Sequence, residues 1–312
     1  MLDSPPLPPL PRRDPQGHKG TFGTVVIIGG CAGPNRQMIG APALTATAAL
    51  RSGAGLARLV MPASILASGI GICPSATGVP LEVSGSGEIV PHEAVRILDE
   101  QTAGCSALVV GPGLGSGEGP RAVTLRAVQQ EDAPVILDAD GLNALAEIPE
   151  VRRDLRAAAV LTPHPGEFRR LAAAFGLEAD PVSPETRPDA AALLAQRLGC
   201  IVVLKGSGTV VSDGQRTWVN DTGGAELATA GTGDVLSGII AGLAAQFYAA
   251  GLPARLPRPP ARPLDLFDTV RLAVRAHGLA GERWAARSGA RAGLLALELA
   301  DELPAVLASM SR

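Results

Sequence analysis

Five short apolar runs in this sequence are each followed by a loop rich in glycine or polar residues. The runs consist mainly of Val, Ile and Leu and are bounded by loop residues, so they predict strands buried on both faces, as in a parallel sheet. Because ligands bind beyond the carboxyl ends of parallel strands, we expect the loops to converge on one site. The runs are 24–28, 107–110, 135–137, 160–161 and 201–204, and the loops begin GG, GPGLG, DADGLN, TPHPGEF and KGSGT.

Segments with helical character alternate with these strands. A helix near 41–51 is followed by a strand at 56–61, which gives the order of a right-handed parallel crossover. Short runs at 210–211 and 217–219 around an Asp-Gly turn predict a hairpin that adds antiparallel strands at an edge of the sheet. The pattern therefore predicts an α/β fold with a mostly parallel sheet. Further helices are expected near 120–130, 166–174, 189–198, 233–246, 266–286 and 292–301.

Prolines mark two segments outside this pattern. Residues 1–16 carry six prolines, which have no N–H group to donate to a helix or a ladder, so we expect residues 1–18 to form a loose arm. A second proline-rich stretch at 253–263 predicts a surface loop. Since the chain has 312 residues and 46% of them are hydrophobic, residues 19–312 are expected to form a single globular domain.

Charge and cysteine content exclude several classes of protein. A net charge of −3 provides no broad basic field, so we expect no nucleic-acid partner. The cysteines form no CxxC pair, which argues against a zinc site or a disulfide framework and fits reduced thiols in a cytosol. We find neither a secretion signal nor an apolar run of membrane-spanning length, so we predict a cytoplasmic protein without a membrane partner. The four cysteines are Cys31, Cys73, Cys105 and Cys200.

The segment 221–246 leads through GTGD into a strongly apolar, helix-spaced run. The free N–H groups and the positive dipole end at a helix N-terminus favour an anion, and glycines let a phosphate approach the backbone closely. Asp234 could complement the helix dipole or serve as a general base. The amides of Gly231, Thr232 and Gly233 could stabilise charge on phosphoryl oxygens. This segment therefore predicts a phosphate loop with a candidate base.

A nucleotide would be held by other loops, because the sequence contains neither GxxxxGK[ST] nor the kinase-type GxGxxGxV. Lys205 directly follows an apolar strand. Its loop, which continues with Gly206, Ser207, Gly208 and Thr209, offers amide and hydroxyl donors suited to phosphate. The alternative is a lysine at a strand end beside a hairpin turn.

Two further loops carry candidate polar groups. His164 lies between two prolines that restrict its backbone, so we favour a binding role, whereas Glu167 could be only a first-turn helix acid. Asp138 and Asp140 could hold Mg²⁺ through water, or they could be turn and capping residues. Asn143 lies at the start of the helix that follows them.

Glycine motifs elsewhere in the sequence are less informative. Gly111, Gly113 and Gly115 of GPGLG could be turn formers. The first loop, IIGGCAGPNRQMIGAPAL, lacks the GxGxxG spacing, and no acidic residue ends the second strand, so we reject a dinucleotide-binding dehydrogenase.

The motifs taken together resemble a known family. GTGD before an apolar helix resembles the signature of ribokinase-like enzymes. In order, KGTFGTVVIIGG, IGAPALTATAALRSGAGLARLVMP, VVGPGLG, VILDADGLNAL, LTPHPGEF, VVLKGSGTVVSDG and AELATAGTGDVLSGIIAGLAAQ resemble successive blocks of the ADP-dependent NAD(P)H-hydrate dehydratases. These blocks span roughly 19–247. The resemblance implies a ribokinase-like three-layer sandwich, with helices on both sides of a mostly parallel sheet.

The resemblance also implies a reaction. ADP or ATP would phosphorylate the hydroxyl group of the S epimer of NAD(P)H-hydrate, and elimination of phosphate would regenerate NAD(P)H, a hydro-lyase activity in metabolite repair. Mg²⁺ is implied by the phosphate chemistry. Asp234 would be the base. The substrate contacts would be Ala41, Gly113, Asn143, His164 and Asp234, and the nucleotide contacts would be Lys205, Gly206, Ser207, Gly208, Thr209, Gly231, Thr232 and Gly233.

Partners and rival functions follow from the same resemblance. It implies a homo-oligomer, with a tetramer favoured. Some relatives carry a fused epimerase domain, and we expect this chain to depend on a separate epimerase protein. The first loop, CAGPNRQMIGAP, departs from the more compact SxGMxGA pattern of the family. The alternative enzyme is a hydroxymethylpyrimidine or hydroxyethylthiazole kinase, and the alternative outside enzymes is a nucleotide sensor without turnover.

Overall fold

The computed structural model describes residues 2–3, 6–33, 36–148, 150–248 and 263–311. These residues form a sheet of ten strands in the order β1-β12-β11-β10-β9-β8-β7-β2-β5-β6. Every neighbouring pair is parallel except those that β11 makes with β10 and β12. The strands are β1 Leu2–Asp3, β2 Thr24–Ile28, β5 Leu56–Pro62, β6 Thr77–Leu81, β7 Ala107–Val110, β8 Val135–Leu137, β9 Ala159–Leu161, β10 Ile201–Leu204, β11 Val210–Ser212 and β12 Arg216–Val219.

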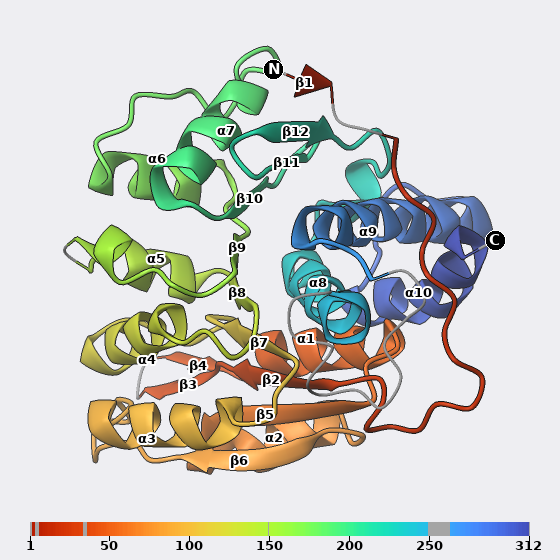
Figure 1. The fold of residues 1–312 in the computed structure, drawn as a ribbon. Helices are drawn as coiled ribbons and strands as arrows, with labels where there is room; N and C mark the ends of the chain where they lie inside the picture. The colour runs from red at the N-terminus through yellow and green to blue at the C-terminus, as the bar shows by residue number, and fades with distance from the viewer. Residues whose placement is uncertain (1, 4–5, 34–35, 149, 249–262, 312) are drawn as a thin grey trace.

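Helices cover both faces of this sheet (Figure 1). One face carries α3 Pro91–Thr102, α4 Glu118–Gln129, α5 Asp140–Ala146, α6 Pro165–Ala174 and α7 Arg187–Leu198. The other carries α1 Gly40–Arg51, α2 Ala63–Ile72, α8 Thr232–Phe247, α9 Leu266–Ser288 and α10 Ala296–Met310. Short elements complete the fold: the hairpin β3 Cys31–Gly33 and β4 Arg36–Met38, and the 3₁₀ turns η1 Val151–Arg153 and η2 Ala225–Leu227. The predicted three-layer α/β class is confirmed.

The two layers of helices have separate hydrophobic cores because side chains alternate along each strand. In β2, Val25 and Ile27 belong to the core under α1, α8 and α9, whereas Val26 and Ile28 belong to the core under α3 and α4. All four side chains are almost completely buried. A strand buried on both faces reads as a continuous apolar run, which is the pattern that predicted the sheet.

Three expectations for individual elements are corrected by the structure. The hairpin β11–β12 forms, but the sheet edge beside it belongs to β1, which pairs with β12 in parallel. The N-terminal arm is not loose throughout, since Leu10 is buried and its N–H donates to the carbonyl of Met310 at 3.1 Å. The last helix begins at Ala296 rather than near 292, because Gly293 has a φ of +93°, which a right-handed helix cannot contain.

One earlier expectation concerns residues that lie almost wholly outside the part of the chain that the structure describes. The proline-rich stretch at 253–263 lies almost entirely in the gap 249–262.

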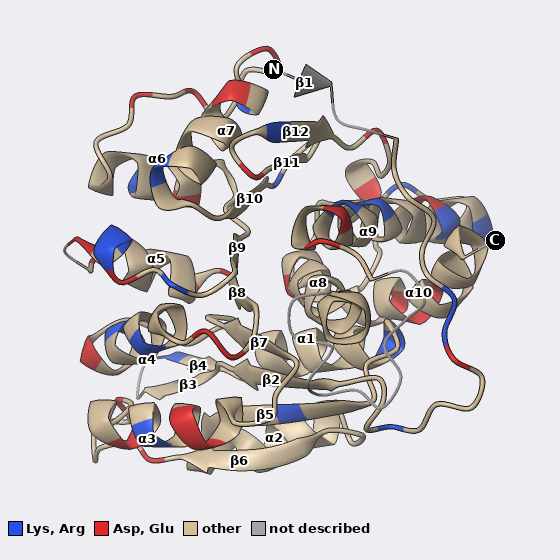
Figure 2. Cartoon of the chain, viewed as in Figure 1, with Lys and Arg blue, Asp and Glu red and all other residues tan. Residues whose placement is uncertain are grey.

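Figure 2 shows acidic and basic residues mixed over the outer helices, in keeping with the small net charge. Within the described ranges, no helix combines the length and the hydrophobicity needed to cross a membrane.

Glycines allow α8 to pack closely on α1. A Cβ atom added to Gly238 would lie 2.3 Å from the carbonyl oxygen of Thr45, and one added to Gly242 would lie 2.8 Å from that of Ala49. Both distances are shorter than any real contact of a Cβ atom, so only glycine fits at this crossing. The close packing fixes the position of α8, whose first turn carries the GTGD motif.

We expect Gly238→Ala to lower the free energy of unfolding by about 1–3 kcal/mol, since the new methyl group would force α1 and α8 apart. Gly71→Ala in α2 is the matched control because nothing lies within 4 Å of its Cβ position. That control should raise stability by up to about 1 kcal/mol through helix propensity. Urea unfolding of both variants measures the difference, and equal effects would show that the crossing is not tight.

Candidate active site

The loops after β8, β9 and β10 bring three charged side chains together. The ammonium Nζ of Lys205 lies 2.8 Å from Oδ1 of Asp138 and 3.9 Å from Oε2 of Glu167. The two carboxylates are buried, and the lysine side chain is only 20% exposed. These residues are far apart in sequence and meet because parallel strands place their carboxyl ends at one edge of the sheet.

Asp138 is held by three donors. Lys205 and the hydroxyl of Thr162 both bond to its Oδ1 at 2.8 Å, and the hydroxyl of Ser237 in α8 donates to its Oδ2 at 2.8 Å. Burial alone would raise the pKa of this carboxyl group, but the positive charge of Lys205 and the hydrogen bonds outweigh it, so the pKa of Asp138 is lowered. Asp138 is therefore a buried anion at neutral pH.

Glu167 has two contacts at once. Its Oε2 accepts a hydrogen bond from the backbone N–H of His164 at 2.8 Å, and Nδ1 of His164 accepts from the N–H of Gly166 at 2.9 Å, so the pair caps the start of α6. Glu167 thus is a first-turn helix acid, and it also faces Lys205. Burial raises the pKa of Glu167, against the opposing charge of Lys205.

The first turn of α8 carries the GTGD motif. Gly231 precedes the helix with a φ of +89°, and the hydroxyl of Thr232 donates to the carbonyls of Leu227 and Thr229 at 2.9 and 3.0 Å. His277 of α9 lies 2.9 Å from the carbonyl oxygen of Thr232 through Nε2. Because a carbonyl oxygen only accepts, Nε2 carries the proton. The turn is therefore held by side-chain and backbone hydrogen bonds on both sides.

His277 is neutral at physiological pH. Burial lowers the pKa of this imidazole to about 4, and the nearby charge of Lys205 acts in the same direction, against the hydrogen bond to Thr232. Sequence reasoning missed His277, because it lies inside a predicted helix with no motif around it.

Asp234 occupies the first turn of α8 with an altered acidity. Burial and the negative charge of Asp138 raise its pKa to about 7, while Lys205 pulls the pKa down. A carboxylate whose pKa lies near the working pH is suited to take up a proton and to release it again. Asp234 therefore has the acidity that a general base requires.

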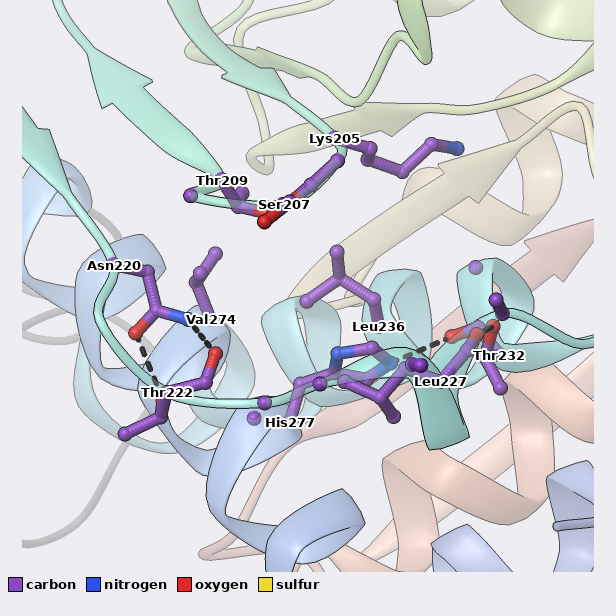
Figure 3. A pocket seen from close by; sticks show the side chains of 18 residues that line it. Lys205, Ser207, Thr209, Asn220, Thr222, Leu227, Thr232, Leu236, Val274 and His277 are labelled. Atoms are coloured by element: carbon purple, nitrogen blue, oxygen red, sulfur yellow. Dashed lines mark hydrogen bonds between the residues drawn. The ribbon is translucent and has the colours of Figure 1, made fainter. Parts of the chain in front are cut away.

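A cavity of about 430 Å³ opens beside this turn (Figure 3). Its volume is in the range of small-molecule sites. Ser207 and Thr209 lie on one side of the cavity, and Leu227, Thr222 and His277 lie on the other. The lining residues are Lys205, Gly206, Ser207, Gly208, Thr209, Asn220, Thr222, Gly223, Gly224, Ala225, Leu227, Ala228, Thr232, Gly233, Leu236, Val274, His277 and Gly278.

The predicted nucleotide residues are brought together at this cavity, with one exception. Lys205 to Thr209, Thr232 and Gly233 line it, whereas Gly231 does not. A Cβ atom on Gly231 would meet the side chains of Ala296 and Leu44 at 2.8 and 2.9 Å, so this glycine lies against α10 and α1. Sequence reasoning also missed the opposite wall of the cavity. There the side-chain NH₂ of Asn220 donates to the backbone carbonyl of Thr222 at 2.8 Å, and the hydroxyl of Thr222 donates to Oδ1 of Asn220 at 2.9 Å.

None of the predicted substrate contacts lines the cavity. Ala41 and Gly113 are neighbours, since a Cβ atom on Gly113 would lie 3.6 Å from that of Ala41. Asn143 accepts a hydrogen bond from Arg170 and donates to Oδ1 of Asp140 at 3.3 Å. His164 is half-exposed at the start of α6.

The strand order separates these contacts from the cavity. Ala41 and Gly113 follow β2 and β7, near the middle of the sheet, whereas the cavity lies beyond β10 and β11. Asp138 follows β8, which lies between β7 and β10 in the sheet.

The carboxylates near this site do not form a metal site of their own. Both oxygens of Asp138 are taken by Lys205, Thr162 and Ser237, and Oδ2 of Asp140 accepts the N–H of Gly115 at 2.9 Å. In the part of the chain that the structure describes, no group of three or more His, Cys, Asp and Glu side chains could hold a metal ion. The residues present thus do not fit a protein-held Mg²⁺, and such an ion would depend on oxygens of phosphate and water.

The fold is that of the ribokinase-like proteins. Residues 25–305 match the family model described as NAD(P)H-hydrate dehydratase, so the chain belongs to this family. The chain is 35% identical to the ADP-dependent (S)-NAD(P)H-hydrate dehydratase of Xanthomonas campestris pv. campestris, over 97% of this chain and 94% of that one. It is 38% identical to the bifunctional NAD(P)H-hydrate repair enzyme Nnr of Salinibacter ruber, over 96% of this chain and 50% of that one.

Solved structures agree with the sequence matches. The ADP/ATP-dependent NAD(P)H-hydrate dehydratase from Bacillus subtilis, co-crystallised with ATP and Mg²⁺, superimposes with a TM-score of 0.77 and 29% identity, covering 99% of this chain and all of that one. A hydroxyethylthiazole kinase from Pyrococcus horikoshii has a TM-score of 0.58 at 16% identity, with 91% of this chain and 88% of that one covered, and shares the fold alone. The chain spans about half the length of the bifunctional curated relatives that it matches.

Proposed function

We propose that this protein catalyses the ADP-dependent dehydration of the S epimer of NAD(P)H-hydrate, with release of NAD(P)H, AMP and phosphate. One observation carries the proposal: Asp234, a carboxylate with a pKa near 7, lies in the first turn of α8, whose residues Thr232 and Gly233 line a cavity of nucleotide size together with Lys205. The names of the Xanthomonas and Bacillus relatives support the choice of reaction. We propose ADP as donor because the Xanthomonas relative is named for it.

We propose that the two substrates bind in two adjoining parts of the site. The nucleotide lies in the cavity, where its phosphates meet the amides and hydroxyls of residues 206–209 and the first turn of α8. The hydrated nicotinamide lies on the side of Ala41, Gly113 and His164. Asp234 is at the boundary, where the acceptor hydroxyl meets the terminal phosphoryl group of ADP.

The reaction then proceeds in two steps. The ring hydroxyl oxygen bonds to the terminal phosphorus of ADP, the bond from that phosphorus to the bridging oxygen breaks, AMP leaves, and Asp234 takes the hydroxyl proton. Next, the carbon–oxygen bond to the new phosphate breaks and a proton leaves the neighbouring ring carbon. The carbon–carbon double bond of NAD(P)H is thereby restored. Lys205 and the backbone amides of the α8 turn stabilise the charge on the phosphoryl oxygens.

Purified protein mixed with hydrated NADH and ADP tests the proposal. We expect the near-ultraviolet absorbance of NADH to return, only when ADP is present and only for the S epimer. The rival function predicts another outcome, because a hydroxymethylpyrimidine or hydroxyethylthiazole kinase would phosphorylate those alcohols with ATP. Phosphorylation of either alcohol without recovery of NADH would overturn the proposal.

The assembly, the location and the partner stay predictions. We propose a homo-oligomer, with a tetramer favoured by the family resemblance, and a cytoplasmic location. A separate epimerase that supplies the S epimer is proposed as the functional partner, and the bifunctional names of several relatives support the link between the two activities. Sedimentation of the purified protein measures its oligomeric state.

A further inference from the structure

We infer that Asp138 is a positioning residue: it holds the ammonium group of Lys205 against the glycine turn of α8, where the transferred phosphoryl group must pass. This inference rests on the proposed function. From the sequence, two roles were considered for Asp138: a ligand of Mg²⁺ through water, or a turn or capping residue. The role inferred here differs from both.

The position of the ammonium group is the first step of the argument. A Cβ atom added to Gly233 would lie 3.5 Å from Nζ of Lys205, so this cation faces the backbone of the GTGD motif. Without a fixed partner, a lysine side chain has four rotatable bonds and many rotamers. Asp138 removes this freedom, because its Oδ1 lies 2.8 Å from Nζ.

The anchoring of Asp138 itself is the second step. Thr162 from the end of β9 and Ser237 from α8 each donate a hydrogen bond of 2.8 Å to its carboxylate, whose side chain is 2% exposed. The carboxylate therefore connects the loops after β8 and β10 to the helix that carries Asp234. A capping or turn residue would have no need of three donors from three other elements.

The backbone around Asp138 is the third step. Ala139 has a φ of +49° and a ψ of −117°, a region that residues with a side chain rarely adopt and that marks strained functional sites. A Cβ atom on Gly111 would lie 1.9 Å from the carbonyl oxygen of Asp138, so the GPGLG loop packs directly on this backbone. The fold thus holds the loop in a strained conformation that turns the Asp138 carboxylate toward Lys205.

The negative charge of Asp138 also affects the pKa of Asp234, the proposed base. Two charged groups act on Asp234, Asp138 after β8 and Lys205 after β10. Glu167 of α6 lies beside that lysine, and the neutral His277 of α9 bonds to the carbonyl of Thr232 in the same turn. Among them, Asp138 raises the pKa of Asp234 and Lys205 lowers it. Removing the negative charge of Asp138 should therefore move the ionisation of Asp234 to lower pH.

Asp138→Asn tests the inference in the hydrated-NADH assay. We expect kcat to fall roughly 100-fold, in line with the loss of one aligned electrostatic group, with ADP still bound. The acid limb of kcat/KM should shift to lower pH, and the Mg²⁺ concentration for half-maximal rate should stay unchanged. Ser237→Ala is the matched control, because it removes one hydrogen bond from Asp138 and no charge, so its rate should fall less and its acid limb should not move.

Three results would overturn the inference. An unmoved acid limb in Asp138→Asn would show a merely structural residue, and a strongly raised Mg²⁺ requirement would show a metal ligand. If Asp138→Asn does not fold, Lys205→Arg provides the test, because arginine keeps the positive charge but places it elsewhere. A wild-type kcat in Lys205→Arg would show that the position of this charge does not matter. Turnover by the wild-type protein in the same assay tests the proposed function separately, so the two failures can be told apart.

Discussion

Asp234→Asn should lower kcat by at least about 1,000-fold, since the amide cannot take the proton from the substrate hydroxyl. ADP affinity should stay close to that of the wild type, because the proposed phosphate contacts are residues 205–209 and the backbone of the α8 turn, which line the cavity. Stopped assays measure the rate, and isothermal titration with ADP measures binding. Unchanged turnover would rule out Asp234 as the base.

The same variant should be more stable than the wild type at pH 8. The folded state raises the pKa of Asp234 from 3.8 to about 7, so the folded protein binds this proton more tightly than the unfolded chain does. Stability therefore falls as the pH rises through this window, and the ionised side chain is destabilising above it. Asparagine removes this effect, so its advantage in Tm should vanish as the pH approaches about 4. The wild-type kcat/KM should decline below pH 7 as Asp234 takes up its proton.

Lys205→Met should lower the free energy of unfolding by about 3–5 kcal/mol near pH 8, because it leaves two buried carboxylates without their shared cation. These carboxylates belong to Asp138 and Glu167, which are 2% and 7% exposed. Their protonation at low pH relieves the unpaired charge. The difference from the wild type should therefore shrink as the pH falls, which unfolding in urea at several pH values measures.

The sequence contains only one other lysine, which provides the control. Lys19 is exposed, so Lys19→Met should change stability by no more than about 0.5 kcal/mol. ADP affinity should fall in Lys205→Met and stay unchanged in Lys19→Met. Equal stability losses in the two variants would contradict the buried ion pair.

The parallel sheet could be predicted because its central strands are buried on both faces and end in glycine or polar loops. Thr77–Leu81, which forms β6, was missed because it is a mostly exposed edge strand that contains glycine and proline, both poor strand formers. Pro91–Thr102 forms the amphipathic helix α3, which was also not predicted, although the proline in its first turn is typical of a helix start.

The candidate site was predictable only in its local part. The GTGD turn and the KGSGT loop are contiguous in sequence, so their residues could be assigned before the fold was known. The pair of Lys205 with Asp138 joins residues 67 positions apart, and no local pattern marks it. His277 reaches the turn from a different helix through one hydrogen bond. Such tertiary contacts depend on how the elements pack, which motif spacing does not encode.

Phosphorus NMR of a reaction mixture tests the coupling of phosphoryl transfer to dehydration most directly. With the S epimer of hydrated NADH and ADP, the account predicts that AMP and inorganic phosphate appear in equal amounts, each matching the NADH recovered in the same sample. A phosphorylated nucleotide product that persists without recovery of NADH, or recovery of NADH without consumption of ADP, would contradict it.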